Sequence, residues 1–340
     1  MDFLAPARKW IVLERSMMKR TRTTWMIVMV VAGLVAVGGW IYGQWGIPSA
    51  NRSVSTERHR SAPAKRVVSL APSITEVLLT LDRGDWLVGV TRFSSYLEPV
   101  RDVEQVGGFT STNYERIISL DPDLVLLKAT REGKQKSALK EAGIETMTVR
   151  QESIDDILRA IRRIGGRLNR SERARAVIDR IEGRMREIRR KTGSRTSPSV
   201  MPVYYRNQGG DGITQVGVAG NRSFLGEIVE VAGGQNVYDG NMAYPKFSIE
   251  YVLREDPDYI VDFSGQYEGQ TRSEREIRDQ WHAFDELKAT RRDRVHVISE
   301  PYALLPGPRF LEILERVARI LHPDLQLEKR SWTLIDDGSP

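Results

Sequence analysis

A repeated pattern is the feature of this 340-residue sequence that most limits its possible folds. Glu115 stands six residues before the sequence Asp-Pro-Asp at 121–123, and Glu250 stands six residues before the same sequence at 256–258. In each copy a helical pattern precedes the Asp-Pro-Asp break and a short apolar run follows it. The alternative is a chance match, because Asp-Pro is a common helix stop. We favour two related lobes, one around each copy.

Short apolar runs alternate with amphipathic segments in both halves of the chain. The expected strands cover residues 66–70, 87–90, 124–127 and 201–205, and the expected helices cover residues 74–81, 114–120, 132–142 and 223–232. A glycine-rich loop is expected between the strand at 201–205 and the helix at 223–232. Such alternation predicts an α/β fold of two Rossmann-like lobes, with mostly parallel sheets and helices on their faces.

One long helix is expected between the lobes. Residues 171–191 carry a stripe of apolar side chains at helical spacing, and 21 helical residues measure about 31 Å at ~1.5 Å each. We therefore predict an N-terminal lobe at 66–168, a backbone helix at 169–192, a C-terminal lobe at 193–325 and a tail at 326–340. A single connecting helix permits only small lobe motions, and the ligand site is expected between the lobes, at the carboxyl ends of the strands.

Residues 25–45 predict a transmembrane helix, because they are mostly apolar and carry no charge. About 20 such residues span a hydrocarbon core of ~30 Å, and the segment has tryptophans near its ends and basic residues before it. We expect a basic cytoplasmic segment at 1–24, an anchor at 25–45 and a flexible tether at 46–65. A cleaved signal sequence is the alternative. Either reading places the body of the protein outside the cytoplasm.

Charge and residue content argue against several classes of function. Of the net charge of +6, residues 1–50 contribute +4, so the body is nearly neutral and no nucleic-acid partner is expected. There is no cysteine, no phosphate-binding glycine loop and no nucleophile motif, and the four histidines are scattered. We therefore expect neither catalytic residues nor a resident metal.

Five segments carry a resemblance to a known family. They are RVVSLAPSITEVLLTL, GGFTSTNYERIISLDPDLVLL, AGGQNVY, YPKFSIEYVLREDPDYIV and LLPGPRFLEILERVARILHPDL, and they extend in order over about residues 66–325. Together they resemble the periplasmic solute-binding proteins of ABC importers whose lobes are joined by one backbone helix. The chain is most similar to the vitamin B12 (corrinoid) branch, with haem and iron-siderophore binders as relatives.

The resemblance implies a function and a set of partners. The protein would capture a corrinoid between its lobes and deliver it to an inner-membrane permease dimer driven by a cytoplasmic ATPase. It would act as a monomer on the periplasmic side of the inner membrane, without a cofactor of its own. In this family one surface glutamate per lobe docks into the permease, and the matching positions are Glu115 and Glu250. A capping box with Thr112 is the alternative for Glu115.

The resemblance also implies ligand contacts. Tyr96, Phe109 and Tyr244 fall where the corrinoid branch places aromatic rings against the macrocycle, although Phe109 and Tyr244 stand where the B12 binders have tryptophan. Lys128 replaces a further ring. These differences leave the ligand open between a corrinoid, a haem and an iron siderophore.

Two further residues are candidates for the ligand site. Ser73 follows a strand and begins a helix, although a capping box with Glu76 would also explain it. Arg309 opens the helix expected at 310–321, where a cation opposes the helix dipole and calls for a compensating anion: a ligand carboxylate, a phosphate or a partner aspartate. An arginine that merely reaches solvent is the alternative.

Other ligands and other functions predict other features. A haem binder would use an iron-ligating tyrosine, for which Tyr96, Tyr205 and Tyr244 are candidates. An anionic siderophore would need cations, for which Lys128, Arg206 and Arg309 are candidates. A membrane-anchored enzyme or sensor on the same fold is a further alternative, but the sequence shows no catalytic constellation, and only about 24 residues precede the anchor.

Overall fold

The structure is a computed structural model that describes residues 64–108, 111–129, 134–209, 212–263 and 273–327. All of these residues belong to one compact unit, which begins at Ser61. None of the helices in these ranges is long and apolar enough to cross a membrane. The predicted anchor at 25–45 and residues 46–63 of the predicted tether lie outside the described residues.

A four-stranded parallel sheet forms what we call the N-lobe, with strand order β2-β1-β3-β4. Its strands are β1 (Val67–Ser69), β2 (Leu87–Val90), β3 (Leu124–Lys128) and β4 (Thr146–Val149), and its helices are α2 (Pro72–Thr80), α3 (Tyr114–Ser119), α4 (Lys134–Glu141) and α5 (Ile154–Arg167). Alternate side chains enter opposite cores: Val67 packs on the α2 and α5 side, and Val68 packs on the α3 side. The runs VVS, LVGV and LVLL are apolar because helices cover both faces.

A six-stranded mixed sheet forms the C-lobe, with order β10-β9-β5-β6-β8 and β7 beside β5. Its strands are β5 (Ser199–Gly209), β6 (Gly212–Val218), β7 (Gln235–Asn236), β8 (Lys246–Ser248), β9 (Tyr259–Asp262) and β10 (Val295–Val297), and its helices are α7 (Phe224–Val231), α8 (Ile249–Glu255), α9 (Glu274–His282), α10 (Lys288–Arg291) and α11 (Phe310–Leu321). β7 and β9 pair with β5 in parallel, and so does β10 with β9, whereas β6 is antiparallel to β5 and β8. The prediction of an α/β fold with mostly parallel strands is confirmed.

The glycine-rich stretch after β5 differs from the expected loop. β5 continues to Gly209, and β6 begins at Gly212 and returns antiparallel to it, so these glycines lie at a β-hairpin. Gly212 has φ +134°, a conformation that favours glycine. The β-branched residues of this stretch, Ile213, Thr214, Val216 and Val218, were the available signal for a strand.

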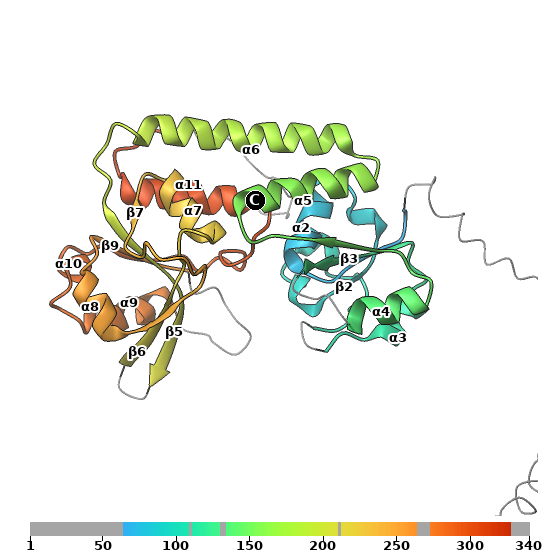
Figure 1. Ribbon diagram of the computed structural model, residues 1–340, viewed down its shortest axis with the longest axis horizontal. Coiled ribbons are helices and arrows are strands. Elements are labelled where there is room, and N and C mark those ends of the chain that lie inside the picture. The colour runs from blue at the N-terminus through green and yellow to red at the C-terminus, as the bar shows by residue number, and fades with distance from the viewer. Residues whose placement is uncertain (1–63, 109–110, 130–133, 210–211, 264–272, 328–340) are drawn as a thin grey trace, which may run out of the picture. The chain divides into compact units, whose positions relative to one another are not determined.

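The long helix α6 (Ser171–Thr192) links the lobes, close to the predicted 171–191. It packs against α5 of the N-lobe and against α7 and α11 of the C-lobe, and it runs along both lobes in Figure 1. Buried residues of α5, α6, α7 and α11 belong to one continuous hydrophobic cluster. The fully buried Arg184 of α6 donates to Glu315 of α11 at 2.7 Å. Because this core extends from one lobe to the other, α6 packs against both lobes as well as connecting them.

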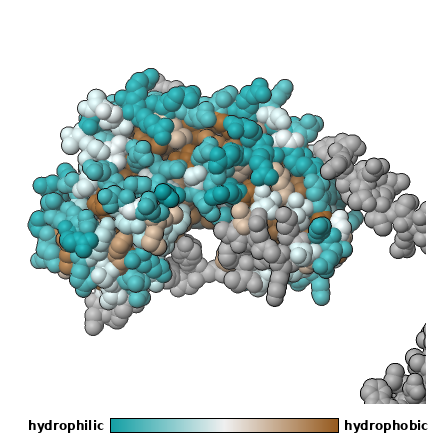
Figure 2. Space-filling model, in the orientation of Figure 1, coloured by the Kyte–Doolittle hydropathy of each residue, from teal (hydrophilic) through white to brown (hydrophobic). Residues whose placement is uncertain are grey.

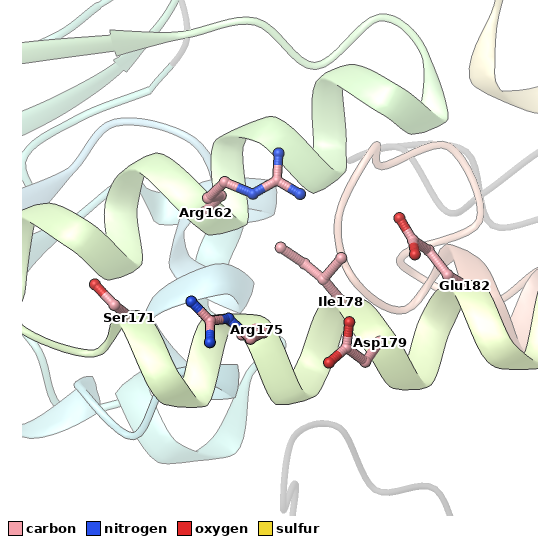
Figure 3. A pocket seen from close by; sticks show the side chains of 6 residues that line it. All are labelled: Arg162, Ser171, Arg175, Ile178, Asp179 and Glu182. Carbon is pink, nitrogen blue, oxygen red and sulfur yellow. The ribbon is translucent and has the colours of Figure 1, made fainter.

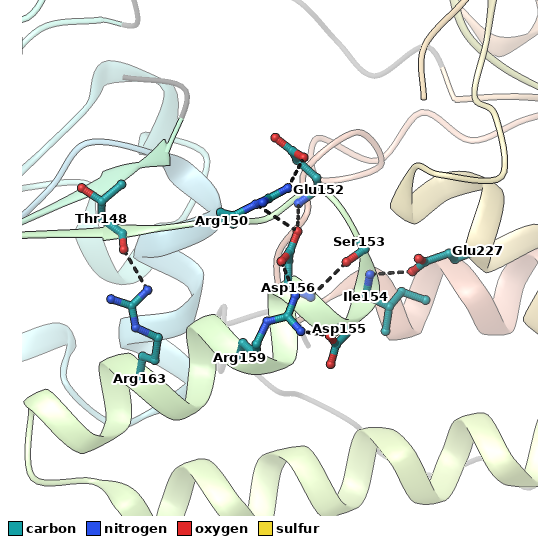
Figure 4. Close-up of polar contacts among 10 residues, drawn as sticks. All are labelled: Thr148, Arg150, Glu152, Ser153, Ile154, Asp155, Asp156, Arg159, Arg163 and Glu227. Carbon is teal, nitrogen blue, oxygen red and sulfur yellow. Dashed lines mark hydrogen bonds and ion pairs between the residues drawn. The ribbon is translucent and has the colours of Figure 1, made fainter. Parts of the chain in front are cut away.

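A second link joins the lobes where β4 passes into α5 (Figure 4). The amide of Ile154, at the start of α5, donates to the Glu227 carboxylate of α7 at 2.6 Å, and the amide of Phe224 donates to the carbonyl of Glu152 at 2.9 Å. Burial raises the pKa of Glu227, although the hydrogen bond from Ile154 opposes this. Glu227 therefore satisfies an orphan helix N–H from the other lobe.

The sequence repeat has a structural counterpart. Asp121 ends the turn after α3 with φ +46°, and Asp256 caps α8 with φ +39°. Each is followed by Pro, Asp and a buried strand, β3 or β9. Both copies thus reverse the chain in the left-handed conformation that Asp tolerates better than most residues.

Candidate ligand-binding site

Three of the candidate residues lie at the carboxyl ends of N-lobe strands or shortly after them. Ser73 follows β1, Tyr96 follows β2, and Lys128 ends β3 of the N-lobe. Figure 2 shows a mostly hydrophilic surface along α6 and a hollow between the lobes on the opposite side. Open α/β sheets place their ligands at such strand ends.

Ser73 lies inside the N-lobe rather than at its surface. It is 1% exposed, and its hydroxyl donates to the Gln151 side chain at 2.8 Å. The predicted capping box with Glu76 is wrong, because Ala71 is the N-cap and no side chain caps α2. The pattern Ser-x-x-Glu occurs here, but Glu76 has a different partner.

Glu76 is a fully buried carboxylate that holds Tyr96. The Tyr96 hydroxyl donates to Glu76 Oε1 at 2.7 Å, and the ring remains only partly buried. Burial raises the pKa of Tyr96, and the Glu76 charge raises it further. Tyr96 therefore stays a neutral phenol, and its hydroxyl is already engaged.

Arg309 supplies the cation that faces Glu76. Its Nε and Nη2 donate to the same Oε1 at 3.0 and 2.7 Å, and the arginine is 6% exposed. Burial raises the pKa of Glu76 while Arg309 opposes this rise, and Glu76 in turn raises the pKa of Arg309 against the effect of burial. The anion that Arg309 requires is thus supplied by the chain itself, across 233 residues.

Aromatic rings complete the surroundings of Arg309. Its guanidinium carbon lies 3.7 Å from the ring centroid of Tyr302 and 5.4 Å from that of Tyr96. The Tyr302 hydroxyl donates to Glu312 at 2.8 Å. Arg309 is thus held between the Glu76 carboxylate and two aromatic rings, which attract a guanidinium.

Tyr244 lies on the C-lobe surface, 40% exposed. Its ring meets that of Tyr204 edge to face at 5.1 Å, and the Tyr204 hydroxyl donates to its carbonyl at 3.1 Å. Tyr205, 36% exposed, carries the Lys246 ammonium 4.3 Å from its ring centroid. Tyr204 and Lys246 were not predicted, and the signal available was their position beside Tyr205 and Tyr244 in the sequence.

Two of the remaining candidates, Arg206 and Lys128, are buried or partly buried. Arg206 is 7% exposed and forms an ion pair with Asp262 at 2.6 Å, and Trp281 donates to the same carboxylate at 2.9 Å. Lys128 is partly buried at the end of β3. Phe109 lies outside the described residues.

Glu115 and Glu250 occupy equivalent exposed positions. Each lies in the first turn of its helix, α3 or α8. The capping-box alternative for Glu115 is wrong, because the N-cap is Asn113, whose side chain accepts from the Arg116 amide. The Ser248 hydroxyl lowers the pKa of Glu250, which keeps that carboxylate charged.

A separate cavity of about 470 Å³ lies between α5 and α6 (Figure 3). It is lined by Arg162, Ser171, Arg175, Ile178, Asp179 and Glu182. Its mixed charges do not single out a ligand, and none of the predicted site residues lines it. Within the described ranges, no three acidic or histidine side chains come together as a possible metal site.

Residues 67–302 match the model of the periplasmic binding protein family, which is more than half of the chain. The chain belongs to this family. The resemblance seen in the sequence is therefore confirmed.

Individual relatives of this periplasmic binding protein are 22–28% identical to it over the aligned residues. An uncharacterised ABC transporter substrate-binding lipoprotein of Bacillus subtilis is 28% identical over 264 residues, 76% of this chain and 81% of that protein. A vitamin B12-binding protein of Vibrio cholerae is 26% identical over 264 residues, 76% of this chain and 90% of that protein. A periplasmic haem-binding protein of Pseudomonas aeruginosa shares the fold, with a TM-score of 0.66, 22% identity and coverage of 77% of this chain and 94% of that one.

Proposed function

We propose that this protein is the extracytoplasmic solute-binding component of an ABC importer and that its ligand is a corrinoid. The observation that carries the proposal is a pair of partly exposed tyrosines, one from each lobe: Tyr96 in the loop after β2 and Tyr244 in the segment just before β8. Aromatic faces suit a flat ligand with an apolar surface and polar edges. The Vibrio cholerae relative, a vitamin B12-binding protein, supports this ligand class.

The cations favour a corrinoid over an anionic siderophore. Arg309 and Arg206, two of the three candidate cations, are buried in ion pairs with Glu76 and Asp262. A siderophore that recruited them would have to replace a buried protein carboxylate, which is costly. Lys128, at the end of β3, and Lys246, against the Tyr205 ring, lie outside these two ion pairs, and so few remaining cations suit a ligand of low net charge.

Haem binding is the second candidate. Tyr205 and Tyr244 have partly exposed rings, so either hydroxyl is a possible iron ligand, whereas the Tyr96 hydroxyl is engaged by Glu76. The similarity to the Pseudomonas aeruginosa haem-binding protein supports the fold alone. The corrinoid remains our first choice because it requires no free phenolate.

Delivery and location complete the proposal. Glu115 and Glu250 would dock one lobe each onto the permease dimer, whose cytoplasmic ATPase supplies the energy, and the protein would act as a monomer. Residues 25–45 would anchor the chain in the inner membrane, or serve as a cleaved signal, with the lobes in the periplasm. The protein would catalyse no reaction and need no cofactor.

Calorimetric titration of the purified full chain tests the ligand. We expect submicromolar binding of cyanocobalamin, and no binding of haemin, ferric citrate or a catecholate ferric siderophore. Haemin binding with a shifted Soret band, weakened by Tyr205→Phe or Tyr244→Phe, would replace the corrinoid by haem. Binding of a ferric siderophore alone would replace it by that chelate, and no binding at all would favour an enzyme or sensor.

A further inference from the structure

Tyr96 is held at its hydroxyl by a group that has no contact with solvent. Tyr96 lies between two short 3-10 turns, Arg92–Ser94 and Glu98–Val100, in the loop after β2. Glu76, from α2, is 0% exposed and accepts the Tyr96 hydroxyl at 2.7 Å. A ring in an irregular loop is thereby fixed to a helix of the N-lobe.

The same carboxylate oxygen is held from the C-lobe. Arg309 donates two hydrogen bonds to Glu76 Oε1, and Arg309 itself packs on Tyr302 at 3.7 Å. Oε1 thus receives three donors, while the buried Oε2 has no hydrogen-bond partner among the described residues. The orientation of the carboxylate, and with it that of Tyr96, therefore depends on both lobes.

Gly307 allows the two lobes to meet this closely. A Cβ atom at Gly307 would lie 2.2 Å from Glu76 Oε2, so any other residue would force either the Glu76 carboxylate or the loop before α11 to shift. Pro306 and Pro308 restrict the backbone on both sides of this glycine. This close approach of the loop to α2 brings Arg309 within hydrogen-bond distance of Glu76.

We propose that Glu76 and Arg309 are positioning residues that hold the Tyr96 ring in its ligand-binding orientation from both lobes. Neither residue is a ligand contact here, because both are buried in their own ion pair. A ring ordered before the ligand arrives loses less conformational entropy on binding. The inference rests on the proposed function in one respect, that Tyr96 contacts the ligand.

Four single variants of the full chain, titrated with cyanocobalamin, separate the ligand contact made by Tyr96 from the positioning of its ring by Glu76 and Arg309. Tyr96→Ala removes the ring and tests the ligand contact itself. Tyr96→Phe keeps the ring and removes only its anchor, and Glu76→Gln weakens the anchor from the other side. Tyr302→Phe is the matched control, because it removes a similar hydroxyl–carboxylate bond beside Arg309 without touching Tyr96.

The expected result is a loss of affinity of about 2- to 12-fold for Tyr96→Phe, the equivalent of ordering one side chain. Glu76→Gln should weaken binding similarly, and Tyr302→Phe should stay within twofold. The double variant Tyr96→Phe/Glu76→Gln should lose no more affinity than either single variant, because both changes break the same hydrogen bond. Full affinity in Tyr96→Phe, with weak binding by Tyr96→Ala, would overturn the positioning role and leave the ligand contact intact. Full affinity in Tyr96→Ala would overturn both.

Hydrogen exchange of the ligand-free chain gives a readout that needs no ligand. If cyanocobalamin does not bind, the proposed function fails, but Glu76→Gln should still speed exchange in peptides covering both 92–100 and 302–310. Unchanged exchange at 92–100 would overturn the anchor. If Glu76→Gln does not fold, Arg309→Lys, which keeps the charge but loses the paired hydrogen bonds, is measured in its place.

Discussion

Asp123 and Asp258 perform the same structural task in the two lobes. Asp123 accepts hydrogen bonds from the amides of Lys65 and Arg66, at 2.8 and 2.9 Å, just before β1. Asp258 accepts from the amide and hydroxyl of Ser199, at 3.1 and 3.0 Å, where β5 begins. In each lobe the last residue of Asp-Pro-Asp thus secures the start of the neighbouring parallel strand.

Asp258→Ala should therefore destabilise the protein. Loss of a carboxylate that accepts two hydrogen bonds should lower the free energy of unfolding by about 1–3 kcal/mol at pH 7, measured by urea denaturation. Asp285→Ala is the control, since Asp285 is exposed, and it should change stability by less than about 0.5 kcal/mol. Equal effects of the two variants would mean that Asp258 is not a structural anchor.

The effect of Asp258→Ala should depend on pH. Partial burial raises the pKa of Asp258, but the Ser199 hydrogen bonds, with Lys288 and Arg292, outweigh this and lower it. A lowered folded-state pKa stabilises the fold above the unfolded-state pKa, and this contribution disappears as pH falls through the folded-state pKa. The difference between variant and wild type should be constant at neutral pH and shrink below about pH 4.

Local patterns allowed much of the fold to be predicted. The apolar stripe placed the long helix at 171–191, within one residue of α6 (Ser171–Thr192), because its apolar residues recur at helical spacing over about six turns and are the ones that the helix buries. The Asp-Pro-Asp repeat pointed to two related lobes because each copy has its own turn and anchor. The β5–β6 hairpin was missed because glycines indicate both loops and hairpins.

The candidate site was harder to predict because its decisive contact is not local. Glu76 lies three residues after Ser73, so the sequence suggested a capping box, but its partner is Arg309 in the other lobe. The need of Arg309 for an anion was recognised, yet only lobe packing identifies that anion. Ion pairs between residues far apart in sequence leave no periodic signal.

Gly307→Ala should show how closely the lobes must approach. The added methyl group would overlap with Glu76 Oε2, so we expect a loss of about 1–3 kcal/mol in the free energy of unfolding. Gly166→Ala is the matched control, because a Cβ there meets nothing within 4 Å and lies within helix α5. That control should be stabilised by about 0.5–1 kcal/mol. An unchanged free energy of unfolding in Gly307→Ala would show that the Glu76 side chain or the loop before α11 shifts without cost.

Tyr244→Ala should weaken ligand binding. Loss of an aromatic anchor from a desolvated contact costs about 1–3 kcal/mol of binding free energy, measured by calorimetry with cyanocobalamin. Tyr244→Phe keeps the ring and its edge-to-face contact with Tyr204, so it should bind nearly as the wild type does. Unchanged affinity with lowered stability in Tyr244→Ala would assign the ring to packing alone. Phe109→Ala makes the same test outside the described residues.

Reversing the charge of both Glu115 and Glu250 should abolish uptake without abolishing binding. Both side chains are exposed in the first turns of α3 and α8, and neither takes part in the Glu76–Arg309 contact. Glu115→Lys/Glu250→Lys should therefore keep its affinity for cyanocobalamin within a few-fold, while cells that carry it accumulate no labelled cobalamin.

The matched control for this pair reverses two exposed glutamates elsewhere, Glu172 of α6 and Glu230 of α7. Glu172→Lys/Glu230→Lys makes the same change in net charge and should leave uptake intact. If both double variants lose uptake equally, net charge rather than docking is responsible. A large affinity loss in Glu115→Lys/Glu250→Lys would instead place these glutamates at the ligand, since a residue that contacts only the permease does not change the affinity of the isolated protein.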